Sequence, residues 1–203
     1  KGISIDRDLI DLLNDEESRN ALINALLNGG YFSQNEINRL VEGIKELDAS
    51  FSYEQQLLSL MKQEFEIHPK TDPVFALARD PAFRRIILNI YDETCAVCGM
   101  RIIISSGIAM IDAAHILPFS QFQNDDARNG LALCKTHHWL FDKGLMTVDG
   151  HYRVKVSKTI EEERPEAIIT SFEGKDLKLP SESTKYPSPI ALEWHRENVF
   201  ERK

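Results

Sequence analysis

Three cysteines and one histidine are spaced like two pairs of metal ligands. Cys95 and Cys98 are separated by two residues, and so are Cys134 and His137. Two such pairs can supply the four tetrahedral ligands of a structural zinc ion, because each tight turn presents two side chains to one side of the ion. Residues 99–133 form a long insert between the pairs, but the entropic cost of closing a loop rises only slowly with its length. The spacing therefore predicts a zinc site, and the alternative is a set of buried free thiols.

A second set of polar residues, able to bind a metal or to move a proton, lies within and just after this insert: Asp112, His115, Asn129, His138 and Asp142. A neutral imidazole can take a proton from water near neutral pH. A divalent ion held by a histidine stabilises the charge that develops on a phosphate. Adjacent helical residues point about 100° apart, so His138 can face away from a zinc ion that His137 binds. These residues fit metal-assisted phosphodiester hydrolysis, and the alternative is that the histidines are structural.

Three short motifs contain these residues: Asp112-Ala113-Ala114-His115-Ile116, Asn129-Gly130-Leu131-Ala132-Leu133-Cys134 and His137-His138-Trp139-Leu140-Phe141-Asp142. The motifs resemble the HNH endonuclease family, and most closely its branch of bacterial restriction enzymes and enzymes that target modified DNA. The resemblance covers residues 95–150. It implies a ββα-metal fold, in which a β-hairpin, a loop with an asparagine and a helix surround a catalytic divalent ion.

The resemblance implies a role for each matched residue. His115 corresponds to the general base, Asn129 to the orienting asparagine, and His138 to the helix ligand of a catalytic Mg²⁺, Mn²⁺ or similar ion. Asn129 cannot titrate, so it would act by fixing its loop or the His115 ring through hydrogen bonds. Many members place a structural zinc site beside the motif. The residues that correspond to its ligands are Cys95, Cys98, Cys134 and His137.

One position departs from the family pattern. Many members carry an aspartate or histidine metal ligand directly before the base, where this chain has Ala114. Asp112 is the nearest replacement, but in a regular strand it lies on the opposite face from His115 and roughly 10 Å away along the chain. Asp142 on the following helix is the rival ligand. Either carboxylate could instead be structural, so the second ligand of the catalytic ion stays open.

Residues 1–70 are predicted to form a helical module with a scaffold, docking or recognition role. Apolar residues recur at helical spacing until Gly29-Gly30 ends the pattern. Two capping boxes, Ser33-Gln34-Asn35-Glu36 and Ser52-Tyr53-Glu54-Gln55, predict the starts of two more helices. A polar, proline-punctuated linker over residues 68–73 then marks the boundary with the second domain.

Residues 79–203 are predicted to form the HNH domain, with its core motif at 95–150. The expected elements are a helix opened by Asp80-Pro81, short strands at 102–104, 108–114 and 131–133, a helix at 135–143, a hairpin turning at Asp149-Gly150 and a last helix after Ser188-Pro189. His151 and His195 lie outside the motifs and are expected to be structural. The predicted fold class is α+β: an N-terminal helical module, then a zinc-stapled ββα-metal domain with a C-terminal hairpin and helix.

The charge distribution bears on how DNA would be bound. The formal net charge is −8, with most of the acidic excess in residues 1–70. A nucleic-acid-binding protein usually presents a basic surface, so this balance counts against tight, non-specific DNA binding. Arg128, Lys135 and Lys143 border the motifs and could contact phosphates or simply be solvated. The sequence begins with Lys1 rather than Met, so we expect targeting by an upstream domain, a homodimer partner or the helical module.

Cysteine usage and hydropathy bear on the compartment. The chain has three cysteines, and an odd number with Cys-x-x-Cys spacing does not fit the disulfide framework of a secreted domain. No apolar run approaches the roughly 18 residues that cross a bilayer, and the first residues lack the pattern of a signal peptide. We therefore expect a cytoplasmic protein with no membrane partner.

These patterns together predict a metal-dependent endonuclease that hydrolyses DNA phosphodiester bonds in restriction or defence, with His115 as general base. The main alternative is a zinc-stabilised nucleic-acid-binding or protein-docking module whose nuclease centre has decayed. Ala114 favours that alternative, whereas intact His115, Asn129 and His138 argue against it. A nuclease that acts on RNA is a further alternative that the sequence leaves open.

Overall fold

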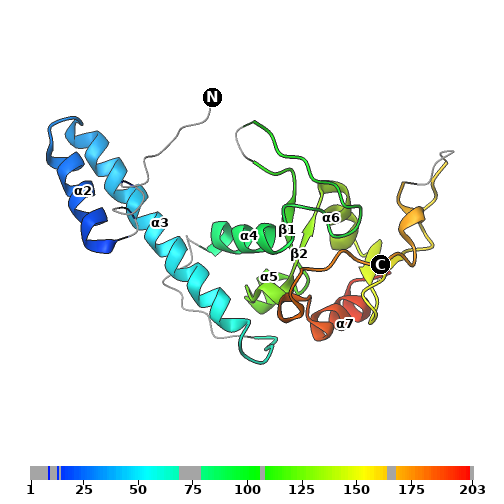
Figure 1. Cartoon of the computed structure of the whole chain (residues 1–203). Helices are drawn as coiled ribbons and strands as arrows, with labels where there is room; N and C mark the ends of the chain where they lie inside the picture. Colours follow the sequence, from blue (N-terminus) through cyan, green and yellow to red (C-terminus); the bar gives the residue numbers. More distant parts are fainter. Residues whose placement is uncertain are drawn as a thin grey trace. The chain divides into compact units, whose positions relative to one another are not determined.

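The computed structural model describes residues 15–68, 79–105, 108–163 and 168–201, together with Leu9 and Leu13 (Figure 1). Ile5 and Leu12, two residues of the expected N-terminal apolar pattern, lie outside the described residues. The chain forms two compact units, Lys1–Asp48 and Ala49–Lys203. The boundary between these units falls inside a helix whose last turns belong to the second unit. Beyond His68, the linker expected over residues 68–73 lies outside the described residues.

The first unit contains α2 (Glu16–Asn28) and the first part of α3 (Gln34–Leu60). The predicted capping box begins α3: the Ser33 backbone N–H donates to the Glu36 carboxylate at 2.8 Å, and the Glu36 N–H donates to Ser33 Oγ at 3.4 Å. This reciprocal pairing satisfies backbone donors that have no partner within the helix.

The second expected helix start, at Ser52-Tyr53-Glu54-Gln55, is wrong. The helix α3 continues without interruption over 27 residues, from Gln34 to Leu60. No glycine or proline occurs between Ile44 and Leu60, so nothing in the sequence breaks the backbone hydrogen bonds there. A capping pattern begins a helix only where the preceding chain is not already helical.

The end of α3 is part of the core of the second unit. Tyr53, Leu57 and Met61 are buried with the rest of that core. Glu54 on α3 pairs with Arg85 at 2.7 Å. One face of residues 49–60 is therefore buried in the core of the second unit.

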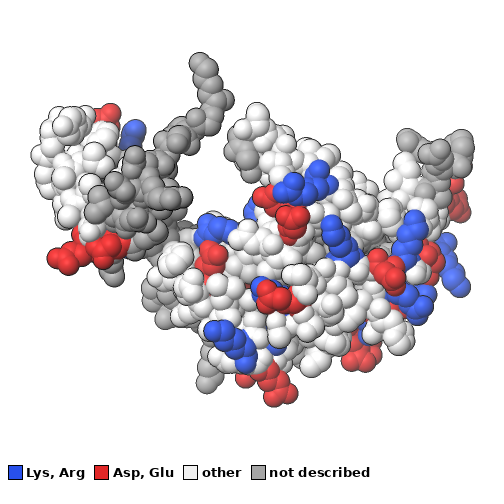
Figure 2. Space-filling model, viewed as in Figure 1, with Lys and Arg blue, Asp and Glu red and all other residues white. Residues whose placement is uncertain are grey.

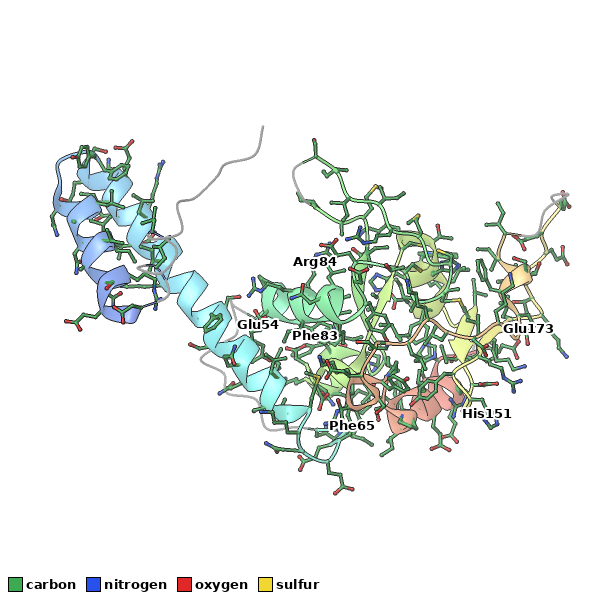
Figure 3. All side chains as sticks on the ribbon, viewed as in Figure 1. Glu54, Phe65, Phe83, Arg84, His151 and Glu173 are labelled. Carbon is green, nitrogen blue, oxygen red and sulfur yellow. The ribbon has the colours of Figure 1, made fainter. Side chains whose placement is uncertain are left out.

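Helix α4 (Arg79–Ile90) packs on the two strands that carry the motifs, β1 (Asp112–His115) and β2 (Gly130–Leu133) (Figures 1 and 3). It buries Phe83, Ile86 and Ile87. The helix begins at Arg79, slightly before the expected start at Asp80-Pro81. Pro81 is tolerated because the first turn of a helix needs no backbone N–H donor.

Strands β1 and β2 pair antiparallel, with His115 opposite Gly130 and Asp112 opposite Leu133. The expected strands at 102–104 and 108–114 are largely wrong. Residues 101–105 lie against residues 108–110 instead: the Ile104 N–H donates to the Ile108 carbonyl at 3.0 Å, and both isoleucine side chains are exposed. Only residues that reach the buried core continue as a strand paired to β2.

The remaining elements of the second unit are α5 (Phe119–Phe122), η2 (Ala127–Asn129), α6 (Lys135–Asp142), β3 (Met146–Val148), β4 (Val154–Val156), η3 (Thr170–Phe172), η4 (Ser183–Lys185) and α7 (Pro189–Asn198). Of these, α6, β3, β4 and α7 were expected, and the four short helices were not. The predicted hairpin is confirmed, because β3 and β4 pair antiparallel around Asp149 and Gly150. Ser188 caps α7 as predicted. Within the described part of the chain, the helices are too short or too polar to traverse a bilayer.

Gly130 allows α4 to approach the strands closely. A methyl group at this position would overlap the side chain of Ile87 and would lie 2.9 Å from Phe83 Cζ. Both side chains are buried and cannot move aside cheaply. Because Gly130 has no side chain, Phe83 and Ile87 of α4 can pack directly against the β1–β2 pair.

We predict that Gly130→Ala lowers the free energy of unfolding by about 2 kcal/mol, since overpacking a filled core typically has that cost. Urea denaturation followed by circular dichroism measures the change. Gly150→Ala is the matched control, because nothing lies within 4 Å of the methyl group it would add. Equal stability of Gly130→Ala and the native chain would contradict the close packing.

Candidate functional site

The four predicted zinc ligands come together at one point. Their ligand atoms all lie within 4.8 Å of one another, and His137 Nδ1 is 3.1 Å from Cys134 Sγ and 3.5 Å from Cys95 Sγ. Cys95 and Cys98 lie in the turn after α4, whereas Cys134 caps α6 and His137 is in its first turn. Three sulfurs and one imidazole in this arrangement are the donor set of a tetrahedral structural zinc site.

The electrostatics of this cluster suit a metal ion. The hydrogen bond from Cys134, supported by one from His137, holds the pKa of Cys95 well below its usual range, and burial raises the pKa of Cys98. The thiolate is the form that binds zinc, so binding would release the remaining protons. Among the described residues, no other group of three or more histidine, cysteine or acidic side chains is this compact.

Loss of one ligand should remove the metal and destabilise the fold. We predict that Cys98→Ser loses stoichiometric zinc and that its thermal unfolding midpoint falls by roughly 10 °C or more, because structural zinc binding is coupled to folding. Elemental analysis and calorimetry measure both quantities. His151→Ala is the control, since His151 is exposed and lies outside the cluster. Unchanged zinc content and stability in Cys98→Ser would exclude the four-ligand site.

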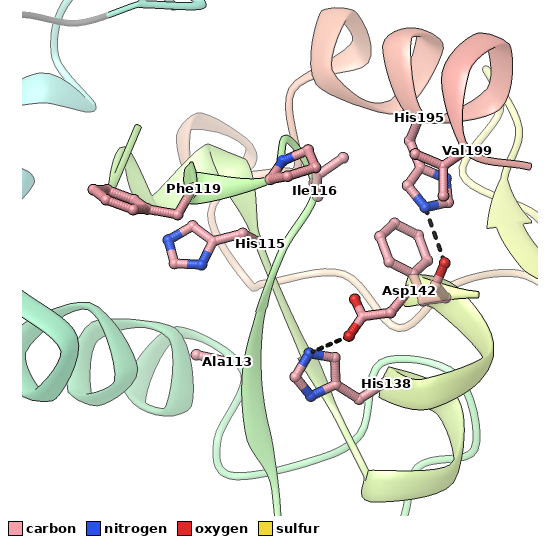
Figure 4. Close-up of a pocket in the computed structure, with 10 residues that line it drawn as sticks. Ala113, His115, Ile116, Phe119, His138, Asp142, His195 and Val199 are labelled. Carbon is pink, nitrogen blue, oxygen red and sulfur yellow. Dashed lines mark hydrogen bonds and ion pairs between the residues drawn. The ribbon is translucent and has the colours of Figure 1, made fainter. Parts of the chain in front are cut away.

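An open cleft of about 440 Å³ lies beside β1, α6 and α7 (Figure 4). His115 lines it from the end of β1, and His138 and Asp142 line it from α6. His195 and Val199 enclose it from α7 and its end. The two histidines expected to do chemistry therefore share one cleft, although they lie on different elements.

The His115 ring is held by contacts on several sides. Its Nε2 lies 2.7 Å from the carboxylate of Asp125, and its face stacks on Phe83 at 4.0 Å between ring centroids. Phe119 also contacts the ring. An ionised carboxylate only accepts hydrogen bonds, so the neutral ring carries its proton on Nε2 and leaves Nδ1 as the basic nitrogen.

Asp125 was absent from the sequence-based expectations. It is 1% exposed at the side chain, and its second oxygen accepts a hydrogen bond from the Tyr53 hydroxyl at 2.8 Å. The only sequence signal was the acidic run Asn124-Asp125-Asp126, which reads equally well as a polar loop. No local pattern connects that loop to a tyrosine on α3.

Asn129 is fully buried and holds the chain that follows β1. Its Nδ2 donates to the carbonyls of Leu117 and Asn124, and its Oδ1 accepts from the Leu117 N–H at 2.8 Å. These contacts fit the first of the two roles considered for this residue, fixing the loop. The His115 ring is held by Asp125.

His138 lies between two carboxylates. Its Nδ1 is 3.2 Å from Asp112 Oδ2, and its Nε2 is 3.4 Å from Asp142 Oδ2 (Figure 4). Asp112 also contacts two cations, Lys135 at 2.6 Å and Arg84 at 3.4 Å. Asp142 lines the cleft with His115, whereas Asp112 does not. Either carboxylate could join His138 as a ligand, but only Asp142 faces His115.

The two carboxylates differ in their electrostatics. Partial burial opposes ionisation of Asp112, but hydrogen bonds from Lys135 and His138 hold its pKa below the usual value. Burial raises the pKa of Asp142. Cations therefore already compensate the charge of Asp112, whereas partial desolvation opposes the ionisation of Asp142.

Arg128 has a structural role, because its donors are used in contacts within the chain. Its guanidinium pairs with Asp126 at 2.7 Å and donates to the carbonyls of Leu60 and Gln63 at the end of α3. Lys135 and Lys143 are exposed on α6. On the face shown in Figure 2, basic and acidic residues are interspersed among the described residues. Of the three basic residues considered for phosphate contacts, the two lysines are the exposed ones, and Lys135 also pairs with Asp112 at 2.6 Å.

His195 has a structural environment, as expected. Its Nε2–H donates to the Phe141 carbonyl at 3.2 Å, so its Nδ1 accepts from the Thr147 hydroxyl at 2.8 Å. Its ring stacks on Phe141. Burial lowers the pKa of His195 to about 4, so the ring stays neutral in the folded chain over the physiological range.

This environment predicts a pH dependence of stability. Below about pH 6.5 the unfolded chain binds a proton at His195 that the folded chain does not bind, so stability falls as the pH decreases toward about 4. The contribution is about 3 kcal/mol over that range. Urea denaturation at several pH values should show a shallower loss of stability in His195→Gln than in the native chain. If the free energy of unfolding of the two proteins fell in parallel with decreasing pH, the lowered pKa of His195 would be contradicted.

Comparison with known proteins was made for the whole chain. Residues 95–149 match a family model described as HNH endonuclease, so the predicted resemblance is confirmed for this segment. A solved structure of a modification-dependent TagI restriction endonuclease is similar, with 19% sequence identity and a TM-score of 0.45. The similarity covers 60% of this chain and 39% of that enzyme's length. No curated protein matches the chain.

Proposed function

Because residues 95–149 match the HNH endonuclease family, we propose that this chain is a metal-dependent endonuclease that hydrolyses DNA phosphodiester bonds. The observation that carries the proposal is the shared cleft of His115 and His138. A base and a metal ligand on separate elements, facing one cavity, are what hydrolysis of a phosphodiester by an activated water requires.

His115 is the general base of the proposed reaction. Asp125 binds its Nε2–H, so Nδ1 is free to take a proton from the attacking water. The resulting imidazolium is stabilised by the buried Asp125 carboxylate. Asn129 supports this geometry indirectly, because it fixes the backbone of Leu117 two residues after His115.

His138 and Asp142 are proposed to hold the catalytic divalent ion, Mg²⁺ or Mn²⁺. Imidazole and carboxylate are suitable donors for such ions, and both side chains line the cleft with His115. Such an ion would stabilise negative charge on the phosphate and on the leaving oxygen. Asp112 then orients His138 through its other ring nitrogen, an outer-sphere contact typical of metal-binding histidines.

The wider role that we propose is restriction or defence in the cytoplasm, with targeting by a homodimer partner or an upstream domain. Its support is the resemblance of the motifs to the restriction branch, the reduced cysteines of the zinc cluster and the net charge of −8. Lys135 and Lys143 on α6 are the residues proposed to contact phosphates. Such contacts position DNA without reading its sequence.

A decayed nuclease is the second candidate, and Ala114 is the observation that favours it. Its side chain is fully buried beside β2 and cannot approach a metal in the cleft. A ligand is therefore missing at the position where many HNH enzymes have one. Asp142 compensates for that loss in the proposed site.

Cleavage of supercoiled DNA tests the proposal. Nicking should require Mg²⁺ or Mn²⁺ and should fall at least about 100-fold in His115→Ala, since general bases contribute that much or more. His151→Ala is the matched control. An RNA substrate of the same sequence, run in parallel, decides between the two nucleic acids. Absence of metal-dependent cleavage in a zinc-loaded chain, on both modified and unmodified DNA, would contradict the proposal.

A further inference from the structure

A tyrosine outside the matched segment is hydrogen-bonded to the carboxylate that holds His115. We infer that Tyr53, acting through Asp125, is a positioning residue that fixes the orientation and the tautomer of His115. The catalytic meaning of this inference rests on the proposed function, but the geometric part stands without it. The site would then extend to α3, more than forty residues before the HNH segment begins at residue 95.

The chain of contacts is short and buried. The Tyr53 hydroxyl donates to Asp125 Oδ2 at 2.8 Å, and His115 Nε2 lies 2.7 Å from Asp125 Oδ1. Tyr53 is 2% exposed, and the Asp125 side chain is 1% exposed. A buried carboxylate is costly unless its oxygens receive hydrogen bonds. Each oxygen of Asp125 receives a donor from a different element, so the carboxylate cannot rotate without losing one of them.

The position of Tyr53 is fixed by the packing of α3. Leu57 and Met61 are buried in the same core, and Arg85 binds both Glu54 and Ser50 at 2.7 Å. Arg128 also binds the end of α3, because its guanidinium donates to the Leu60 carbonyl at 2.9 Å. These contacts lock residues 49–60 against the elements that carry Asp125 and His115, as a positioning role requires.

The consequence for His115 is a single neutral tautomer. A carboxylate at Nε2 selects the ring form with the proton on Nε2, and leaves Nδ1 as the basic nitrogen. Without the Tyr53 hydroxyl the carboxylate loses its donor at Oδ2 and is held less firmly. The ring would then hold its Nε2 proton less firmly.

Nitrogen-15 spectroscopy of the histidine side chains in the full-length chain tests this geometry without any substrate. At about pH 8, where a free histidine is neutral, native His115 should carry its proton on Nε2, and that proton should exchange slowly with water. Tyr53→Phe keeps the ring but lacks the hydroxyl, and it should speed the exchange. Asp125→Ala should give a mixture of tautomers.

Tyr152→Phe is the matched control, because it removes a tyrosine hydroxyl that donates to the Pro187 carbonyl. Its His115 signals should equal those of the native chain. The inference is overturned if native His115 carries its proton on Nδ1, or if exchange in Tyr53→Phe is as slow as in the native chain. The signals are assigned by their loss in His115→Ala.

A kinetic cycle tests the functional part. Tyr53→Phe should lower kcat about 3- to 10-fold with little change in KM, the effect of one hydrogen bond. In an Asp125→Ala background, Tyr53→Phe should cause no further fall in kcat. If Tyr53 acted independently of Asp125, the substitution would lower kcat by the same factor in the native chain and in Asp125→Ala. Additive losses would overturn the inference. If no variant or native chain cleaves DNA while the spectra are as expected, the proposed function fails and the positioning of His115 stands.

Discussion

The antiparallel pairing of β1 with β2 sets the position of every residue in the cleft. Its register puts His115 opposite Gly130 and Asp112 opposite Leu133, one residue before Cys134 of the candidate metal cluster. A shift of one residue would turn His115 to the other face of the sheet. The same shift would separate Asp112 from α6, so both halves of the site depend on this short ladder.

Three features keep this four-residue ladder in register, since two short strands alone are only marginally stable. The cysteine and histidine cluster joins the turn after α4 to the start of α6. Gly130 lets α4 pack directly on the strands. Asn129 fastens the chain that leaves β1 to the chain that enters β2. The three features hold different ends of the ladder, so they act together to fix His115 and His138.

Sequence reasoning succeeded where the physical cause lies in neighbouring residues. The zinc cluster, the cap of α3 at Ser33 and the hairpin at Asp149 each depend on spacings of a few residues. Sequence reasoning failed where a residue's role depends on contacts with residues far away in the sequence. The partners of Asp125 are separated from it by 10 and 72 residues, and no periodicity or motif predicts such a pair. The cap at Ser52 failed because helix continuity overrides a local pattern.

The most direct measurement is the location of a second metal ion in crystals of the full-length chain grown with Mn²⁺. Anomalous maps on either side of the manganese edge distinguish that ion from zinc. We expect zinc at the cysteine cluster and manganese at His138, with Asp142 as a further ligand and His115 facing it across the cleft. Saturating Mn²⁺ with no peak at His138 would contradict a metal-dependent nuclease centre in this cleft.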